Sequence, residues 1–187
     1  MRAVCKTSAA IFEAAINRIP TGETSVTLDA GNQANGGAIM ALHVENIGDC
    51  QYGPLYSFAH YYEQNGDMMR DPDVVMIACM NRATGALILY PISYRQDGLG
   101  IDREDVVFNE DGNGYRIRKQ SQADLATFCG QWGRNLKQQQ RLEPAAPRRR
   151  ARIGGSVLTR CEICKKDCST MAGLIVHVRK FHPALND

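Results

Sequence analysis

Four residues near the C-terminus have the types and the spacing of a zinc site. Two residues separate Cys161 from Cys164, twelve separate Cys164 from His177, and four separate His177 from His182. Zn2+ favours a closed tetrahedron of thiolate and imidazole ligands, which a Cys pair on a tight turn and a His pair on one helix face can supply. The spacing therefore predicts that these four side chains hold a structural zinc ion, the one cofactor that we expect.

The residues around these ligands resemble a Cys2His2 zinc finger. The run from Gly173 to His182 is similar to the helix that carries both histidines in that family, with Leu174 at the position of its core leucine. The resemblance implies a small ββα fold over residues 158–187, which the metal stabilises without taking part in a reaction. Cys168 departs from the family, which has an aromatic core residue there. Its thiol is either a small buried side chain or an alternative zinc ligand.

The finger lacks the side chains that would read a base sequence. In a DNA-reading finger, helix positions −1, 3 and 6 contact the bases. Here these positions are Thr170, Gly173 and Val176. None of them can form the bidentate pairings that distinguish guanine or adenine. We therefore expect binding to DNA or RNA with weak sequence specificity.

Basic residues are concentrated in the same C-terminal segment. Residues 148–187 carry nine Lys or Arg and three acids, a net charge of +6, whereas residues 1–147 carry 13 and 17, a net charge of −4. A basic arm on an acidic body is typical of polyanion binding, and the alternative is a solvated basic linker without a ligand. The predicted phosphate-binding residues, called the basic arm below, are Arg148, Arg149, Arg150, Arg152, Arg160, Lys165, Lys166, Arg179 and Lys180.

The predicted finger helix carries more apolar side chains than a module of this size can bury. They are Met171, Leu174, Ile175, Val176 and Val178. Part of this surface is expected to contact the first domain, a second copy of the chain or a partner protein. A second function therefore stays open, that of an interaction or anti-defence protein whose acidic domain mimics nucleic acid.

The rest of the chain, residues 1–142, has the pattern of an α+β domain. Apolar residues at helical spacing predict one helix over Ser8–Arg18 and a closing helix that opens at Ser121, a candidate N-cap, and ends before Pro144. The closing helix is expected to bury Leu125, Phe128, Cys129, Trp132 and Leu136. Strand patterns between turn signals predict an antiparallel meander. The expected strands are 25–28, 39–45, 55–62, 74–79, 87–94, 106–108 and 115–118. Residues 143–157, rich in Pro and Arg, are predicted to be a flexible linker.

The composition indicates a cytoplasmic protein. The chain has 187 residues and no apolar run near the roughly 20 residues that span a bilayer. Cys5, Cys50, Cys79 and Cys129 lack paired spacing, which predicts buried free thiols rather than a disulfide framework. We expect no membrane partner.

Three segments within residues 8–142 resemble a family of small uncharacterised domains carried on plasmids, integrative elements and phages. They are Asn-Gly-Asp-x-Met-Arg-Asp-Pro at residues 65–72, Tyr-Pro-Ile-Ser-Tyr-Arg-Gln-Asp at residues 90–97, and Trp-x-x-Asn-Leu at residues 132–136. The resemblance implies an accessory protein of a mobile element. It implies no particular activity, cofactor or catalytic residue.

The first of these segments, predicted to be a loop, has the densest chemistry of the domain. In a structural interpretation Asp67 and Asp71 cap turns, while Arg70 clamps the carboxylate of Asp67 or Asp73. In a functional interpretation the two aspartates join His60, Glu63 and Asp73 in a divalent-metal or acid–base site, as in a nuclease. A lone histidine beside an apolar strand is more often structural, and no second acidic motif clearly completes a two-metal site. A metal-dependent nuclease is thus the third alternative, and the sequence favours a protein that is not an enzyme.

Overall fold

The computed structural model of the chain describes residues 1–29, 39–81, 84–109, 114–144, 159–160 and 167–168. The chain forms two compact units, residues 1–147 and 148–187. In the second unit the described elements are two short strands, β9 (Thr159–Arg160) and β10 (Asp167–Cys168), which pair antiparallel. The predicted linker, beyond residue 144, lies outside the described residues, as do the four predicted zinc ligands.

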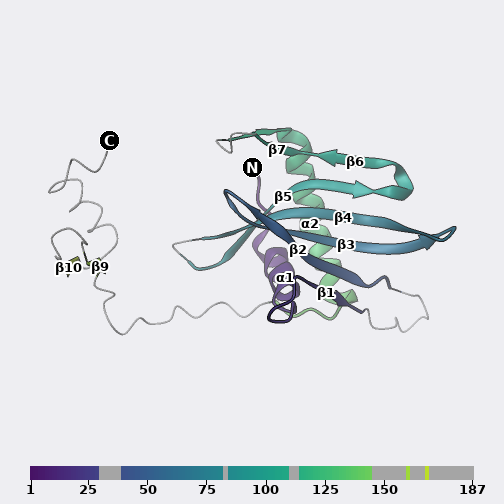
Figure 1. Cartoon of the computed structure of the whole chain (residues 1–187), viewed down its shortest axis with the longest axis horizontal. Helices are drawn as coiled ribbons and strands as arrows, with labels where there is room; N and C mark the ends of the chain where they lie inside the picture. Colours follow the sequence, from purple (N-terminus) through teal and green to yellow (C-terminus); the bar gives the residue numbers. More distant parts are fainter. Residues whose placement is uncertain (30–38, 82–83, 110–113, 145–158, 161–166, 169–187) are drawn as a thin grey trace. The chain divides into compact units, whose positions relative to one another are not determined.

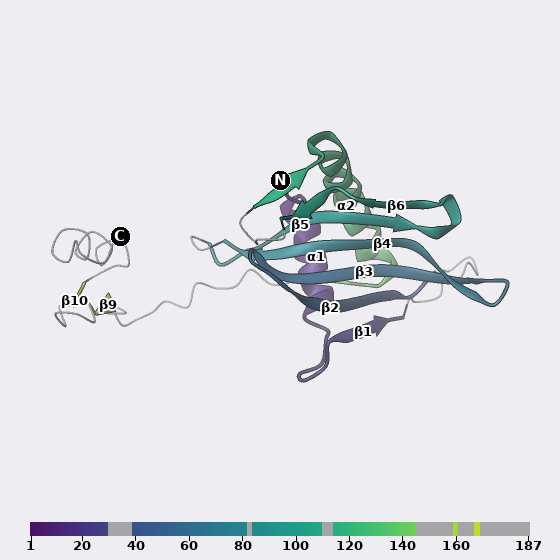
Figure 2. The same cartoon turned by 45° about the horizontal axis from the view of Figure 1, so that its top comes forward.

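The first unit is an α+β domain in which both long helices cover one face of an antiparallel sheet (Figures 1 and 2). The sheet has six strands that lie side by side in chain order. They are β1 (Ser25–Leu28), β2 (Leu42–Cys50), β3 (Gly53–Gln64), β4 (Asp67–Met80), β5 (Leu87–Gln96) and β6 (Ile101–Glu104). Helix α1 (Lys6–Ile16) precedes the sheet and α2 (Lys119–Gln139) follows it. The predicted helix, meander and closing helix are confirmed.

Short turns join several neighbouring strands of the sheet. The β3–β4 hairpin turns at Asn65 and Gly66, whose φ angles are 57° and 88°. Two successive residues with positive φ match the right-handed twist of the flanking strands, and Asn-Gly is the sequence that adopts this turn most readily. The short 3-10 helix η1 (Asp97–Leu99), followed by Gly100 with a φ of 63°, links β5 to β6. These turns place β4 beside β3 and β6 beside β5.

The main core lies between the helices and the inner face of the sheet. Phe12 of α1 packs edge-on against Phe58 of β3 and Trp132 of α2, with ring centroids 4.8 Å and 5.6 Å away. The predicted stripe of the closing helix is buried as expected, with one exception. Phe128 keeps 38% of its surface exposed, because it lies beside the core in a cleft under the sheet.

The outer face of the sheet has a smaller apolar cluster under a second hairpin. Strands β7 (Val106–Phe108) and β8 (Tyr115–Ile117) pair antiparallel. Their side chains pack with Ile77 and Tyr90 of the sheet. The strand pattern of β4 explains the two clusters, since Val74, Met76 and Ala78 belong to the main core while Ile77 belongs to the outer one.

Several sequence-based expectations were wrong in detail. The predicted loop at residues 65–72 is a tight turn followed by the first residues of β4, and β6 was missed. Helix α2 begins at Lys119, so Ser121 is not its N-cap. The hydroxyl of Ser121 instead donates a hydrogen bond to the buried Asp105, 2.6 Å away. Among the cysteines, Cys129 is buried as predicted, whereas Cys5 is exposed.

Helices α1 and α2 approach closely at two glycines. The Ser8 hydroxyl donates to the Gly130 carbonyl at 2.6 Å. A Cβ atom added at Gly133 would lie 2.6 Å from Ser8 Cβ and 3.1 Å from Ser8 Cα. At Gly130 the nearest atom to an added Cβ is the Cys5 sulfur, at an ordinary 3.5 Å. The two positions therefore differ in how much room they leave between the helices.

We predict that Gly133→Ala destabilises the full-length chain by about 1–3 kcal/mol, because the added methyl group must push the helices apart. Gly130→Ala is the matched control. It is expected to be neutral or stabilising by up to about 1 kcal/mol, because Ala favours a helix. Urea denaturation followed by circular dichroism measures both changes. Equal destabilisation by the two variants would show that Gly133 is not the point of close contact.

Candidate functional site

A bulge between β3 and β4 builds the polar site of the first unit. Ala59 pairs with Asp73 and Tyr61 pairs with Arg70, so His60 alone faces both Asp71 and Pro72. Two residues of β4, Asp71 and Pro72, therefore occupy one position of the ladder. The side chains that precede this bulge consequently lie on the opposite faces from those that a regular strand would give. As a result Asp71 and Pro72 line a cleft on the helix side of the sheet, together with His60.

The cleft lies between the sheet and the C-terminal half of α2 and has a volume of about 420 Å3. One wall is aromatic, with Phe128 and Trp132 stacked at 6.0 Å and Tyr94 edge-on to Phe128 at 5.5 Å. The other lining residues are Ile39, Met40, His60, Asp71, Pro72, Gln96, Asn135 and Gln139. All three segments behind the family resemblance contribute to this lining.

His60 has hydrogen-bond partners for both ring nitrogens. Its Nδ1 is 2.8 Å from the Ala41 carbonyl oxygen, which can only accept, so Nδ1 carries the proton. The Trp132 indole N–H donates to Nε2 at 3.4 Å. Burial lowers the pKa of His60 below its ordinary value of 6.5, against the opposing effects of the Ala41 carbonyl and Asp71. His60 is therefore neutral at pH 7, and its geometry favours the structural interpretation.

A chain of hydrogen bonds fixes the polar wall of the cleft. The Tyr94 hydroxyl donates to Gln96 Oε1 at 2.6 Å. Gln96 Nε2 donates in turn to Asp71 Oδ1 at 2.5 Å. Among the described residues, Asp71 Oδ2 has no hydrogen-bond partner. The chain therefore orients the carboxylate and leaves one of its oxygens available to a ligand.

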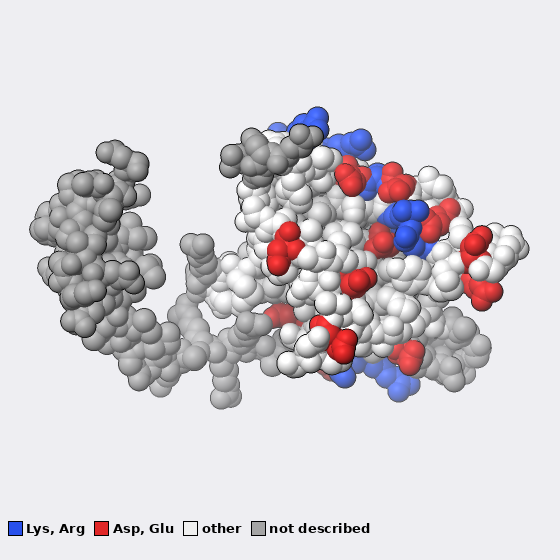
Figure 3. Space-filling model, in the orientation of Figure 1, with Lys and Arg blue, Asp and Glu red and all other residues white. Residues whose placement is uncertain are grey.

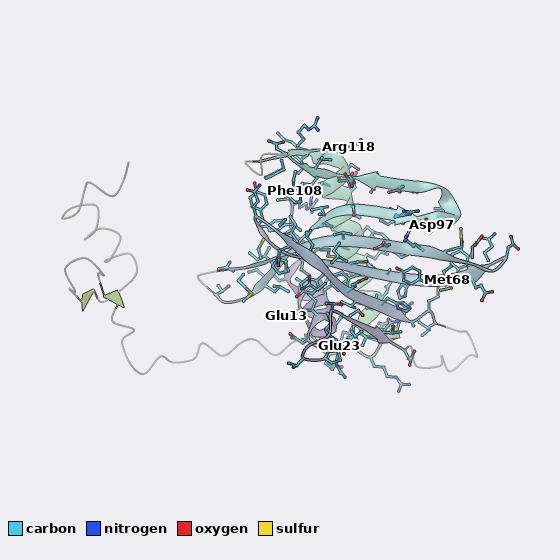
Figure 4. The ribbon with its side chains drawn as sticks, in the orientation of Figure 1. Glu13, Glu23, Met68, Asp97, Phe108 and Arg118 are labelled. Atoms are coloured by element: carbon cyan, nitrogen blue, oxygen red, sulfur yellow. The ribbon has the colours of Figure 1, made fainter. Side chains whose placement is uncertain are left out.

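The other two residues of the predicted functional segment lie elsewhere. Asp67 is exposed at the tip of the β3–β4 hairpin, beside the exposed Met68 that Figure 4 labels. Arg70 forms an ion pair with Asp73 at 3.6 Å, as the structural interpretation predicts, and a second with Asp97 at 3.8 Å. The structure thus brings His60 and Asp71 together and separates them from Asp67 and Arg70.

Ion pairs compensate charge on the outer face of the sheet. Asp97 accepts hydrogen bonds from the Arg70 backbone N–H at 2.9 Å and from the Arg95 guanidinium at 2.8 Å. These bonds, in that order, lower the pKa of Asp97. Figure 3 shows one group of basic atoms with acidic atoms around it on this face of the molecule, and further acidic groups that lie apart from it. Asp73, Asp97 and Asp102 are therefore paired with arginines.

Within the described ranges, no three His, Cys, Asp or Glu side chains come together as a metal site would require. Asp67 and Asp71 are four residues apart on an extended strand, which separates them by about 13 Å. This geometry gives the nuclease alternative no support in the first unit. No helix in the described part of the chain is long and apolar enough to cross a membrane.

The fold and the cleft define a small α+β domain with an aromatic and acidic pocket on the helix-covered face of its sheet. The chain belongs to a family described as a domain of unknown function, DUF6908, whose model matches residues 12–142. This agrees with the resemblance to a family of small uncharacterised domains. No curated protein and no solved structure matches the chain.

We predict that His60→Gln weakens the pH dependence of folding stability. The unfolded chain binds a proton at His60 near pH 6.5, whereas burial keeps the folded chain from doing so until the pH is lower. The free energy of unfolding therefore falls as the pH drops below about 6.5, and this loss disappears with the imidazole. Urea denaturation between about pH 7 and pH 5, followed by circular dichroism, measures the difference.

His43→Gln is the matched control for this experiment. The His43 ring lies on the outer face of the sheet, edge-on to Tyr61 at 4.9 Å and 3.0 Å from the Thr27 hydroxyl. We expect this variant to keep the wild-type pH dependence. A His60→Gln curve that parallels the wild type would contradict the assignment of His60 as a buried neutral histidine.

Proposed function

We propose that this protein is a zinc-binding accessory protein of a mobile element or phage that binds nucleic acid through its C-terminal unit. The phosphate contacts come from the basic arm, and the zinc ion of Cys161, Cys164, His177 and His182 folds the module that carries part of it. The first unit has a separate ligand.

The pairing of β9 with β10 is the observation that carries this proposal. Arg160 pairs with Asp167, and Thr159 pairs with Cys168, in an antiparallel ladder. Cys161 and Cys164 both fall between the two strands in the sequence. A Cys-x2-Cys pair between two antiparallel strands, followed by a His pair, is the order of elements that a ββα zinc module requires.

Charge supports the nucleic-acid part of the proposal. The second unit has a net charge of +6 and the first a net charge of −4. Phosphate contacts by Lys and Arg release condensed counterions, so an arm of nine basic residues can bind nucleic acid without reading its bases. Thr170, Gly173 and Val176 at the base-reading positions agree with such non-specific binding.

We predict that the purified full-length chain holds one zinc ion and that Cys161→Ser loses it. Removing a thiolate opens the tetrahedron, and a three-ligand site binds the metal more weakly. Cys5→Ser, at an exposed cysteine of the first unit, is the control and should keep the metal. Zinc content by mass spectrometry measures both. Full zinc occupancy in Cys161→Ser would exclude the predicted ligand set, and Cys168→Ser tests the alternative thiolate directly.

We predict that replacing Arg148, Arg149, Arg150 and Arg152 by Gln weakens binding to labelled duplex DNA and to single-stranded RNA. The slope of log K against log salt should fall by about 0.9 for each duplex phosphate contact that is lost. A matched control replaces four basic residues of the first unit, which are all exposed: Arg116, Arg118, Lys119 and Arg134. The control should bind as the wild type does.

The outcome separates this function from the interaction alternative. If the zinc-loaded wild type binds neither DNA nor RNA at low salt, phosphate binding is excluded. The result would then favour the alternative function, in which the finger helix binds a partner protein. If both sets of substitutions weaken binding equally, the contacts come from overall charge and the assignment to the arm is wrong. The pairing of Asp73, Asp97 and Asp102 with arginines removes part of the negative charge that nucleic-acid mimicry by the first unit would need.

A further inference from the structure

The cleft of the first unit has no role in the proposed nucleic-acid binding, and its chemistry indicates a different ligand. Among the described residues that line the cleft, Asp71 is the one acid and none is a Lys or Arg, while His60 is neutral. A phosphate would meet a carboxylate with no cation in the described lining to offset the repulsion, because the nearby Arg103 guanidinium lies over the Tyr94 ring and is paired with Asp105 at 3.5 Å. A ligand with a positive charge would instead be attracted.

The aromatic wall points to the same class of ligand. The negative faces of aromatic rings attract cations, and guanidinium groups stack on them most readily. The first unit already contains one example, since the guanidinium carbon of Arg103 lies 5.3 Å from the centroid of the Tyr94 ring. Phe128, 38% exposed and stacked on Trp132, offers a further ring to a ligand in the cleft.

We propose that this cleft binds a guanidinium group, with Asp71 Oδ2 accepting its N–H donors and the aromatic wall covering its plane. The hydrogen-bond chain from Tyr94 through Gln96 holds the carboxylate in place before the ligand arrives, which reduces the ordering cost of binding. The volume of about 420 Å3 is within the usual range for a small-molecule site.

An adjoining hollow favours an arginine side chain of a peptide as the source of the guanidinium. This hollow, of about 320 Å3, shares Ile39, Asn135 and Gln139 with the cleft and adds Gln138. Side-chain amides supply both donors and acceptors, which is what a peptide backbone needs next to its side chain. The cleft would then bind the arginine side chain, and the hollow would bind the peptide backbone.

The test titrates the full-length protein with arginine whose two ends are capped by acetyl and methylamide groups, and with agmatine, its free small-molecule counterpart. Trp132 is the single tryptophan of the chain and lines the cleft, so its fluorescence reports occupancy. We expect saturable binding of capped arginine that exceeds that of capped lysine. Tighter binding of capped arginine than of agmatine assigns the site to a peptide, and the reverse order assigns it to a free guanidinium compound.

Two variants locate the site. Asp71→Asn keeps an acceptor for Gln96 while removing the charge, and should weaken binding about 10- to 100-fold, the usual effect of losing a charge-assisted hydrogen bond. Phe128→Leu should weaken it about 2- to 5-fold, the size of an exposed cation–π contact.

The matched controls are Asp67→Asn on the same strand and Tyr52→Leu, whose ring is 37% exposed on the outer side of the domain. Both should bind as the wild type does.

Three results would overturn the proposal. They are the absence of binding by both guanidinium probes at millimolar concentration, unchanged affinity in Asp71→Asn, and tighter binding of the uncharged base in guanosine than of either guanidinium. Circular dichroism confirms that each variant is folded. Because Cys161→Ser lacks the predicted zinc ligand but keeps the cleft, guanidinium binding in that variant tests the cleft independently of the nucleic-acid function.

Discussion

The bulge at His60 is the constraint on which the polar chemistry of this domain depends. In a regular ladder, residues two apart share a face, so Arg70 would lie on the side of Val74 and Met76 and Asp71 on the side of Asp73. The bulge inserts one residue between Arg70 and Asp73 and reverses this assignment. Arg70 then reaches the carboxylates of the outer face, while Asp71 enters the cleft. A single extra residue therefore decides which carboxylate can bind a ligand and which is neutralised.

Packing and binding share the same side chains at this end of the domain. Trp132 has 6% of its surface exposed, contacts Phe12 in the core and donates its N–H to His60. Its ring also forms part of the cleft wall. A wall supported in this way by buried neighbours loses little conformational entropy when a ligand binds. The close contact of α1 with α2 at Ser8 and Gly133 has the same effect, because it fixes the helix that carries Phe128 and Trp132.

Local sequence patterns predicted the elements better than the site. Ser25–Leu28 and Val106–Phe108 have the predicted bounds, and the two helices lie within two residues of their expected starts. The long hairpin of β3 and β4 was missed in part because its tip is polar, and polarity near an Asn-Gly turn also indicates a loop. The alternation of residues along a strand does not reveal a bulge, so the sequence could not predict on which side of the sheet Asp71 lies. Tyr94, Gln96 and Asn135 were within segments already noted for their resemblance to a family, which was the one available signal for the cleft.

The two units carry opposite net charges, which affects whether the chain can bind both of the proposed ligands. A unit of net charge −4 repels the nucleic acid that a unit of net charge +6 attracts, unless distance or salt screens the repulsion. The Debye length is about 8 Å at physiological salt, so charges of the first unit that lie farther than this from a bound polyanion are largely screened. At low salt the repulsion extends further and partly offsets the phosphate contacts. An acidic domain with a cation-binding cleft and a basic arm can therefore work in one chain at cellular ionic strength, each with a ligand of opposite charge.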